Sequence, residues 1–302
     1  MLQNPALSDC DRQSTEPSGR VREVAGFDIA AGLAESELVA VRDEVLRHGA
    51  VVLRDQYLTP DQHLAFTGRL AQVDHNPKRP AGKVHAPTVD GFPEIVVVSN
   101  IKKDGHPIGL TDAGLLWHTD TQSSATPELF VTLNAITIPV RDGIALGDTR
   151  YTSTTAAYDA LDAAMKARLD GLRAIHSYAY HVDAIAARGL LTRAPLSKEQ
   201  REAQPEISHP LVRTHPITGR KLLYVSESYT ERVEGMSAEE SRALLDLLFA
   251  HIVEPRFQLL HKWREGDLVV WDNCATQHLA TFDYGDIPRL LHRCGTMGPT
   301  PV

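Results

Sequence analysis

Short apolar runs of strand length occur near the beginning, in the middle and near the end of this chain. The strands expected from these runs cover residues 50–53, 94–99, 115–120, 129–138, 147–151, 256–263, 267–272 and 289–295. The helical patterns between them are too few for a regular alternation of strands and helices, which disfavours a doubly wound parallel sheet. The sequence therefore predicts a mainly β fold with flanking helices, as in a β-sandwich or jelly roll.

Four longer helices are expected around these strands. They cover residues 35–48, a segment that begins at residue 60, residues 156–172, and residues 237 to about 251. Two of them begin with a capping signal, because Thr59 precedes Pro60 and is followed by Gln62, and Ser237 is followed by Glu240. Such side chains bind the first amides of a helix, so they fix the residue at which it begins.

The charge balance and the cysteines limit the classes of partner. Lysine and arginine number 31 against 39 aspartates and glutamates, and no basic run occurs, so a nucleic-acid partner is not expected. The longest apolar runs have only strand length, and acids stand where a signal peptide would have its apolar core, so no membrane partner is expected. Cys10, Cys274 and Cys294 are too scattered for a disulfide framework, which favours a cytoplasmic protein. Association into a homo-oligomer stays open.

Two segments differ in composition from the rest of the chain. Residues 1–19 mix polar residues, proline and glycine without periodicity, so we expect a disordered lead-in before a single domain at 20–302. Residues 176–210 are rich in histidine, arginine and proline and have the least regular pattern. We expect a mobile flap there, with a short helix capped by Ser197 and Gln200.

One short motif points to metal chemistry. His118 and Asp120 are two residues apart in Leu-Trp-His-Thr-Asp, and on a strand both would point to the same face. An imidazole and a carboxylate side by side form half of a metal site. The same motif also arises by chance, as an exposed histidine near an exposed aspartate.

A second segment adds the residues that would complete such a site. His278 lies 158 residues beyond Asp120, directly after the run at 267–272. Two histidines and one carboxylate on one face of a metal leave the opposite face open, as in the non-haem Fe(II) oxygenases. On a strand, Arg289 and Arg293 would share a face, and two inward guanidinium groups require anions to meet them. The alternative is a pair of surface arginines on an edge strand.

Longer stretches around these residues carry a resemblance. They are LRHGAVVLRDQYLTPDQ (46–62), LWHTD, GDTRYTSTTAAYDAL (147–161), HPLVRTHPITGRKLLYVSE (209–227) and VVWDNCATQH (269–278). Over roughly residues 22–298 the chain resembles the Fe(II)/2-oxoglutarate-dependent dioxygenases of the TauD/TfdA (taurine / 2,4-dichlorophenoxyacetate dioxygenase) family. The resemblance implies a double-stranded β-helix, or jelly roll, flanked by helices.

The resemblance also implies roles for individual residues. His118, Asp120 and His278 would bind iron. Arg289 would pair with the distal carboxylate of 2-oxoglutarate with help from the Thr149 hydroxyl, and Arg293 would help hold the co-substrate or an anionic substrate. The implied co-substrates are 2-oxoglutarate and O2, and the products include succinate and CO2. Hydroxylation is the default outcome, with desaturation or epoxidation as variants. Because Asp120 is retained, halogenation is rejected.

Two tryptophans beside these residues have a structural interpretation. Trp117 precedes the first implied ligand, and Trp271 ends the run before His278. Large aromatic side chains at such positions most often pack in a core, so we expect both of them there.

The substrate contacts differ from those of taurine-oxidising members. Asn76 stands where those proteins have a histidine, and Gly114, four residues before His118, stands where they have an asparagine. Gly114 would leave space for a bulkier substrate. Arg79 and Arg293 would face an anionic group of the substrate. The alternative for residues 74–79 is a solvated loop. We expect a small organic, anionic substrate or a natural-product intermediate. A zinc hydrolase on the same three residues and a non-catalytic jelly-roll binding protein are the alternatives.

Overall fold

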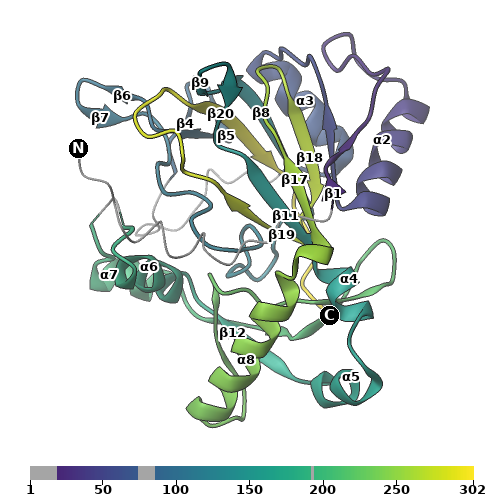
Figure 1. Ribbon diagram of the computed structural model, residues 1–302, viewed down its shortest axis with the longest axis vertical. Coiled ribbons are helices and arrows are strands. Elements are labelled where there is room, and N and C mark those ends of the chain that lie inside the picture. The colour runs from purple at the N-terminus through teal and green to yellow at the C-terminus, as the bar shows by residue number, and fades with distance from the viewer. Residues whose placement is uncertain (1–18, 74–85, 192–193) are drawn as a thin grey trace.

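Two β-sheets pack face to face in the computed structural model, which describes residues 19–73, 86–191 and 194–302 (Figure 1). The larger sheet consists, in order, of β2 (Arg22–Glu23), β3 (Ala50–Leu53), β18 (Leu268–Asp272), β8 (Phe130–Thr137), β20 (Leu290–Gly295), β5 (Phe92–Ser99) and β4 (Thr88–Val89). The smaller sheet consists of β1 (Gly19–Arg20), β17 (Gln258–His261), β11 (Thr149–Ser153) and β19 (Thr276–Ala280). This is the mainly β jelly roll that the sequence predicts.

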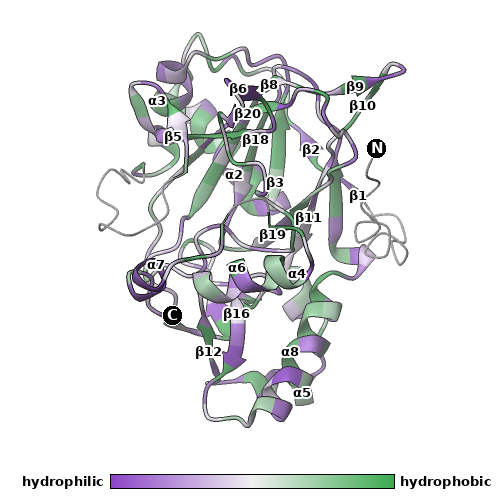
Figure 2. Ribbon diagram, turned by 90° about the vertical axis from the view of Figure 1, so that its left-hand side faces the viewer, coloured by the Kyte–Doolittle hydropathy of each residue, from purple (hydrophilic) through white to green (hydrophobic). Residues whose placement is uncertain are grey.

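Strand alternation divides the side chains of the larger sheet between two cores. In β18, Val269 and Trp271 pack between the two sheets, together with Tyr151 from β11. Leu268 and Val270 point to the opposite face and pack under the helices. Figure 2 shows that the central strands of this sheet are largely hydrophobic. Both faces of the sheet are therefore covered, which explains why the expected run has no polar alternation.

Two helices cover the outer face of the larger sheet. They are α2 (Glu35–His48) and α3 (Pro60–Leu70). The Thr59 side chain accepts a hydrogen bond from the amide of Gln62, and the Gln62 side chain accepts one from the amide of Thr59, which confirms the predicted start of α3. Helix α2 covers the predicted residues and ends at Gly49, where φ is 79° and the amide donates to the carbonyl of Val45.

A second lobe lies below the sheets in Figure 1. Its helices are α4 (Thr154–Asp159), α5 (Ala163–Leu169), α6 (Tyr178–Ala187), α7 (Lys198–Glu202) and α8 (Ala238–Ile252), with a short 3-10 turn at Pro255–Phe257. Its strands are β12 (Arg173–His176), β13 (Ile207–Pro210) and β16 (Thr230–Val233), and the pair β14 (Val212–Thr214) and β15 (Lys221–Leu223). The buried side of α8 packs against α4 and these strands. Its predicted cap is confirmed, since Ser237 accepts from the amide of Glu240.

Two small hairpins complete the strands of the described residues. They are β6 (Lys102–Lys103) with β7 (His106–Pro107), and β9 (Val140–Arg141) with β10 (Ile144–Ala145). No helix among the described residues has the length and apolar composition needed to cross a membrane.

The structure corrects three predictions on secondary structure. Residues 115–120 form turns with an isolated bridge between His118 and His278, not a strand. The helix expected at 156–172 is two helices, because Asp162 caps a new one. The segment 176–210 contains the helix α6, which we did not predict, in addition to the short helix that is capped by Ser197 and Gln200 as expected.

The strand expected at 289–295 begins one residue later in the structure, so Arg289 lies just before it. The pairing of β20 with β8 shifts between Leu290 and Leu291, so simple alternation does not place Arg289 and Arg293 on one face. Strand β20 runs between β8 and β5 in the interior of the sheet. The alternative of two surface arginines on an edge strand is therefore wrong.

Candidate active site

The three residues predicted as metal ligands meet at one edge of the smaller sheet. His278 lies in β19, paired on one side with Tyr151 of β11. On its other side, the amide of His118 donates to the carbonyl of His278 at 3.3 Å, and the amide of His278 donates back at 2.9 Å. The two imidazole rings are 4.1 Å apart between centroids. The bridge brings His118 and Asp120 beside a histidine that is distant in sequence.

The candidate ligand atoms converge on one point. Atoms of His118, Asp120 and His278 lie within 4.8 Å of one another. The Nε2 atom of His118 is 3.4 Å from Asp120 Oδ1, and the Nε2 atom of His278 is 3.8 Å from Oδ2. These side chains are 9%, 16% and 12% exposed in chain order, so a small ligand could still reach the cluster.

The hydrogen bonds of the cluster favour a bound cation. His118 Nδ1 is 2.8 Å from the carbonyl of Leu116, which can only accept, so Nδ1 carries the proton and Nε2 presents a lone pair to Asp120. Burial, with a contribution from His118, lowers the pKa of His278 to about 3, so the His278 imidazole is neutral. A carboxylate facing two imidazoles fits a divalent metal, and these donor types suit Fe(II).

One asparagine fixes the position of the aspartate. The buried side chain of Asn273 accepts from the amide of Asp120 and donates to the carbonyls of Asp120 and Glu128, each at 3.0 Å. Thr119 donates to the carbonyl of Thr276 in β19 at 2.9 Å. The turn that follows β18 therefore positions both Asp120 and His278.

A second cluster of metal-ligand types has a structural role instead. His215, Asp272 and Cys274 lie close together and are buried. The amides of residues 217 and 218 donate to His215 Nδ1, so Nε2 carries the proton and donates to Asp272. Burial raises the pKa of the Cys274 thiol to about 12. His215 therefore presents a proton, not a lone pair, to Asp272. The His215–Asp272 pair stabilises the turn before His278.

Arg289 is a buried guanidinium that lacks a carboxylate partner within the described ranges. It is 4% exposed, and Nη2 donates to the carbonyl of Gly147 at 3.3 Å, while Nε has no hydrogen-bond partner among the described residues. Burial lowers its pKa from the ordinary value of arginine. Gly147 permits this approach, because a Cβ there would lie 2.8 Å from Arg289 Nε. Such a group is suited to an incoming anion.

Thr149, also buried, lies at the start of β11. Its hydroxyl oxygen accepts from the indole of Trp263 at 3.0 Å, which leaves the hydroxyl proton to be donated. Strand β11 pairs with β19, the strand of His278, so Thr149 and the metal cluster are held by the same sheet. This geometry is compatible with the expected help to a bound carboxylate.

Arg293 has very different surroundings. Its Nε donates to Asp120 Oδ2 at 3.2 Å, and Nη2 lies 3.0 Å from the same oxygen. Both terminal nitrogens also bind the carboxylate of Glu128. Burial opposes ionisation of Asp120, but the Arg293 guanidinium outweighs it and holds the pKa of Asp120 well below its usual range.

The structure changes the interpretation of the predicted substrate residues. Gly114 has a φ of +87°, and a Cβ there would lie 2.9 Å from the Cβ of Ala280. The glycine therefore serves a tight contact with the end of β19, and the space that we expected beside it for a larger substrate is filled. Asn76 and Arg79 lie outside the described residues.

Aromatic side chains extend from the cluster towards α6. The ring of Tyr229 lies 6.4 Å from that of His118, and the His181 ring stacks on Tyr229 at 4.6 Å and 19°. His181 belongs to α6 and is 2.6 Å from the hydroxyl of Ser228. The sequence analysis did not select these residues, and a histidine in an apolar helix is too common to have revealed this role.

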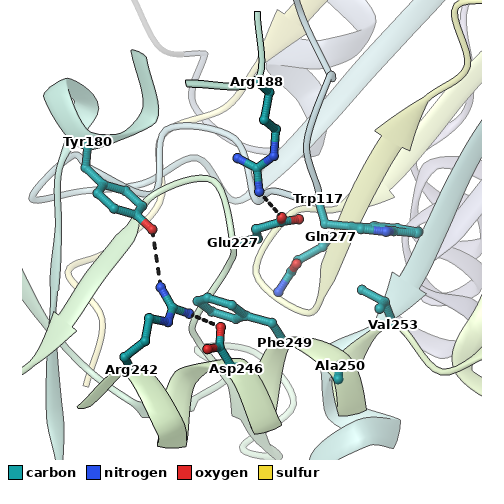
Figure 3. A pocket seen from close by; sticks show the side chains of 10 residues that line it. All are labelled: Trp117, Tyr180, Arg188, Glu227, Arg242, Asp246, Phe249, Ala250, Val253 and Gln277. Atoms are coloured by element: carbon teal, nitrogen blue, oxygen red, sulfur yellow. Dashed lines mark hydrogen bonds and ion pairs between the residues drawn. The ribbon is translucent and has the colours of Figure 1, made fainter. Parts of the chain in front are cut away.

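A pocket of about 290 Å³ lies beside the residues that directly precede His118 and His278 in the sequence (Figure 3). Trp117 and Gln277 line it together with residues of α6 and α8. Trp117 is thus half-buried at a pocket, contrary to the core position expected, whereas Trp271 is buried as expected. The charged residues at this pocket form ion pairs, Arg188 with Glu227 and Arg242 with Asp246.

Comparisons with known proteins agree with this site. The taurine catabolism dioxygenase TauD, TfdA family model matches residues 12–295. The alpha-ketoglutarate-dependent 2,4-dichlorophenoxyacetate dioxygenase of Burkholderia sp. (strain RASC) is 32% identical over 92% of this chain and 91% of that protein. Pentalenolactone F synthase of Streptomyces arenae is 35% identical over 61% of this chain and 62% of its own length.

A solved structure resembles the whole molecule. It is AAD-2 in complex with Mn(II) and N-oxalylglycine, with a TM-score of 0.75 and 29% identity, over 95% of this chain and 97% of that one. The jelly roll, the two-histidine-one-carboxylate cluster and the match to the family model thus agree. The chain belongs to the TauD/TfdA family and is an Fe(II)/2-oxoglutarate-dependent dioxygenase.

Proposed function

We propose that His118, Asp120 and His278 hold Fe(II), that Arg289 and Thr149 bind the distal carboxylate of 2-oxoglutarate, and that the enzyme oxidises a small organic substrate. The observation that carries this proposal is the convergence of two imidazoles and one carboxylate on one point, together with a buried guanidinium that has no carboxylate partner among the described residues. A metal with three protein ligands on one face and a fixed anion-binding group matches this set of residues.

The residues of this chain divide the work as follows. When bound, Fe(II) with 2-oxoglutarate and O2 supplies an oxidant that removes hydrogen from a substrate C–H bond, with release of succinate and CO2. The Leu116 carbonyl sets the His118 tautomer, and Asn273 and Arg293 orient Asp120. Arg289 anchors the co-substrate, and Tyr229 with His181 forms a wall beside His118. Hydroxylation is the proposed outcome, with desaturation or epoxidation as variants.

The substrate is a small molecule, and relatives give its scale. One relative named above is a 2,4-dichlorophenoxyacetate dioxygenase. The other, pentalenolactone F synthase, takes part in making a natural product. We propose a substrate of similar size, for which α6 and Tyr229 provide an aromatic wall.

A zinc hydrolase on the same three residues is disfavoured by Arg289. Hydrolysis by a metal-bound water needs no second anion-binding group, so a buried guanidinium without a carboxylate partner among the described residues would be an uncompensated cost. A non-catalytic binding protein would likewise have no use for the converging ligand atoms.

The location and assembly are also proposals. The two cysteines among the described residues, Cys274 and Cys294, are free and buried, which supports a reducing cytoplasmic setting. We propose neither a nucleic-acid nor a membrane partner, on the basis of the acidic net charge of −8 and the strand-length apolar runs. Light scattering of the purified chain would settle whether it forms a homo-oligomer.

The test of the proposed reaction begins without oxygen. Addition of 2-oxoglutarate to the Fe(II)-loaded protein should produce a visible absorption band, and subsequent O2 should yield succinate from 2-oxoglutarate. His48→Ala on the exposed side of α2 serves as a control and should behave as the wild type does. Absence of the band, together with hydrolysis supported by Zn(II), would favour the hydrolase instead.

A further inference from the structure

Arg293 is occupied by a carboxylate of this chain. We propose that Glu128 is a specificity-determining residue, which neutralises Arg293 and restricts the site to substrates that carry no negative charge at this position. The proposal deepens the proposed function and rests on it, because it concerns the substrate of the same metal site. It differs from the expectation that Arg293 holds an anionic substrate, and the experiment below decides between the two.

The contacts leave little of the guanidinium for an outside anion. Nη1 of Arg293 lies 3.2 Å from Glu128 Oε1, and Nη2 binds Oε2. The remaining edge, Nε with Nη2, faces the carboxylate of Asp120 at 3.2 and 3.0 Å. A planar guanidinium offers two such edges for paired hydrogen bonds, and both are engaged here.

Metal binding would not free Arg293 for a substrate anion. A divalent ion on Asp120 draws on the charge of that carboxylate, yet Glu128 still supplies a full negative charge to Arg293. The Glu128 side chain is only 6% exposed and that of Arg293 16% exposed. A substrate anion would therefore have to displace the Glu128 carboxylate from Arg293 and break a buried ion pair.

The backbone holds Glu128 in this position. Its amide donates to the Thr121 hydroxyl at 2.8 Å, and its carbonyl accepts from Asn273 at 3.0 Å. Asn273 also holds Asp120, so one side chain spaces both carboxylates around Arg293.

A glycine makes room for the carboxylate. Gly295 lies in β20, two residues after Arg293, and a Cβ there would be 2.0 Å from Glu128 Oε1. Any other residue would force the Glu128 carboxylate to move. The placement of Glu128 against Arg293 thus depends on two positions that are far apart in the sequence.

The comparison of the two arginines supports this assignment. Arg289 directly precedes β20 and Arg293 lies within it, yet among the described residues only Arg293 has carboxylate partners. The fold leaves one guanidinium available to an anion, as a 2-oxoglutarate anchor requires, and closes the other.

The experiment compares two probes with the same skeleton and different charge, phenoxyacetate and its uncharged amide, phenoxyacetamide. Each is titrated anaerobically into the Fe(II)/2-oxoglutarate form, and binding is followed by the change in the visible band. The wild type should bind the acid at least about tenfold more weakly than the amide. Glu128→Gln keeps the shape, removes the charge, and should raise affinity for the acid about tenfold or more, while the amide changes less than about threefold.

Two further variants keep the result interpretable. Gly295→Ala displaces the Glu128 carboxylate sterically and should shift the ratio in the same direction. Glu206→Gln removes a similar two-point pair with Arg232 on the exposed surface and should leave the ratio unchanged.

The outcomes separate this proposal from the proposed function. A wild type that prefers the acid, or a Glu128→Gln variant with no gain of acid binding, overturns the role of Glu128. Loss of the 2-oxoglutarate-dependent band in the wild type would instead contradict the proposed function. The acid-to-amide ratio is a readout that a purely structural role of Glu128 would not shift.

Discussion

At the scale of single residues, the two arginines near the metal site differ in their partners. Among the described residues, only Arg293 forms ion pairs with carboxylates. The sequence predicts the cluster of His118, Asp120 and His278, because their types and the blocks around them are specific. It could not predict that Arg293 is neutralised, because Glu128 lies in no motif and its effect depends on Gly295, 167 residues further along the chain. Contacts of this kind exist only after the sheets pack.

Removal of a metal ligand should have the largest effect on activity. In His278→Ala, a facial site loses one of three protein donors, so we expect turnover and Fe(II) affinity to fall by more than about a hundredfold. Iron content after desalting and succinate formation measure the two effects. His48→Ala is the matched control, and full activity of His278→Ala would contradict the assignment.

Removal of Arg289 should affect the co-substrate and not the metal. A paired, charge-assisted contact contributes about 1.5–3 kcal/mol, so Arg289→Ala should raise the apparent 2-oxoglutarate constant roughly ten- to hundredfold. Iron binding should persist. An unchanged constant in steady-state succinate assays would place the anchor elsewhere.

At the scale of elements, capping signals located helices better than periodicity did. Thr59, Ser197 and Ser237 each cap a helix that begins where expected. The expected helix at 156–172 fails because Asp162, itself a cap, restarts the chain after a turn. The segment before Asp120 resembles a strand because it contains the short apolar run Leu115–Trp117, yet its bridge to β19 is an isolated one at His118.

The turn that carries Asn273 should be a stability hot spot. Asn273→Ala removes three hydrogen bonds and leaves buried partners unsatisfied, so we expect a loss of about 2–4 kcal/mol in the free energy of unfolding. Urea denaturation of the metal-free protein measures this. Asn100→Ala is the comparison, because Asn100 also makes three side-chain hydrogen bonds but is only half-buried, so its loss should cost less.

The segment 176–210 remains a proposed flap. Helix α6 reaches the site through the His181 stack on Tyr229, so its position should respond to occupancy. We expect amide hydrogen exchange in α6 to slow when substrate and 2-oxoglutarate are both bound, with α2 unchanged as an internal reference. Equal exchange in α6 in every state would make the segment an ordinary surface insertion.

At the scale of the whole molecule, buried histidines should make the protein sensitive to acid. Burial lowers the pKa of His63 to about 3 and that of His209 to about 4, below the ordinary 6.5. Below pH 6.5, each of these histidines stays neutral in the folded protein but gains a proton on unfolding. The free energy of unfolding is therefore highest above pH 6.5 and decreases as the pH falls towards the folded-state pKa values. The slope is about 1.4 kcal/mol per pH unit for each histidine.

Urea midpoints between pH 7 and 4.5 measure this slope. In His63→Gln, which keeps a polar partner for Thr132, the slope should decrease by about the amount of one histidine. The matched substitution at the exposed His48 is the control for general effects of replacing a histidine. A variant with the wild-type slope would show that His63 does not contribute.

The position of β20 has a consequence for how the chain is made. It lies between β8 and β5. Cys294 of β20 pairs with Thr132 of β8, which lies 162 residues earlier in the chain. At roughly 5–20 residues per second, about 10–30 s pass between synthesis of the two strands. During that interval both β8 and β5 lack their shared neighbour, so the nascent chain presents open strand edges that favour aggregation. Protection from proteases on the ribosome should therefore arise late, when residues 290–295 emerge.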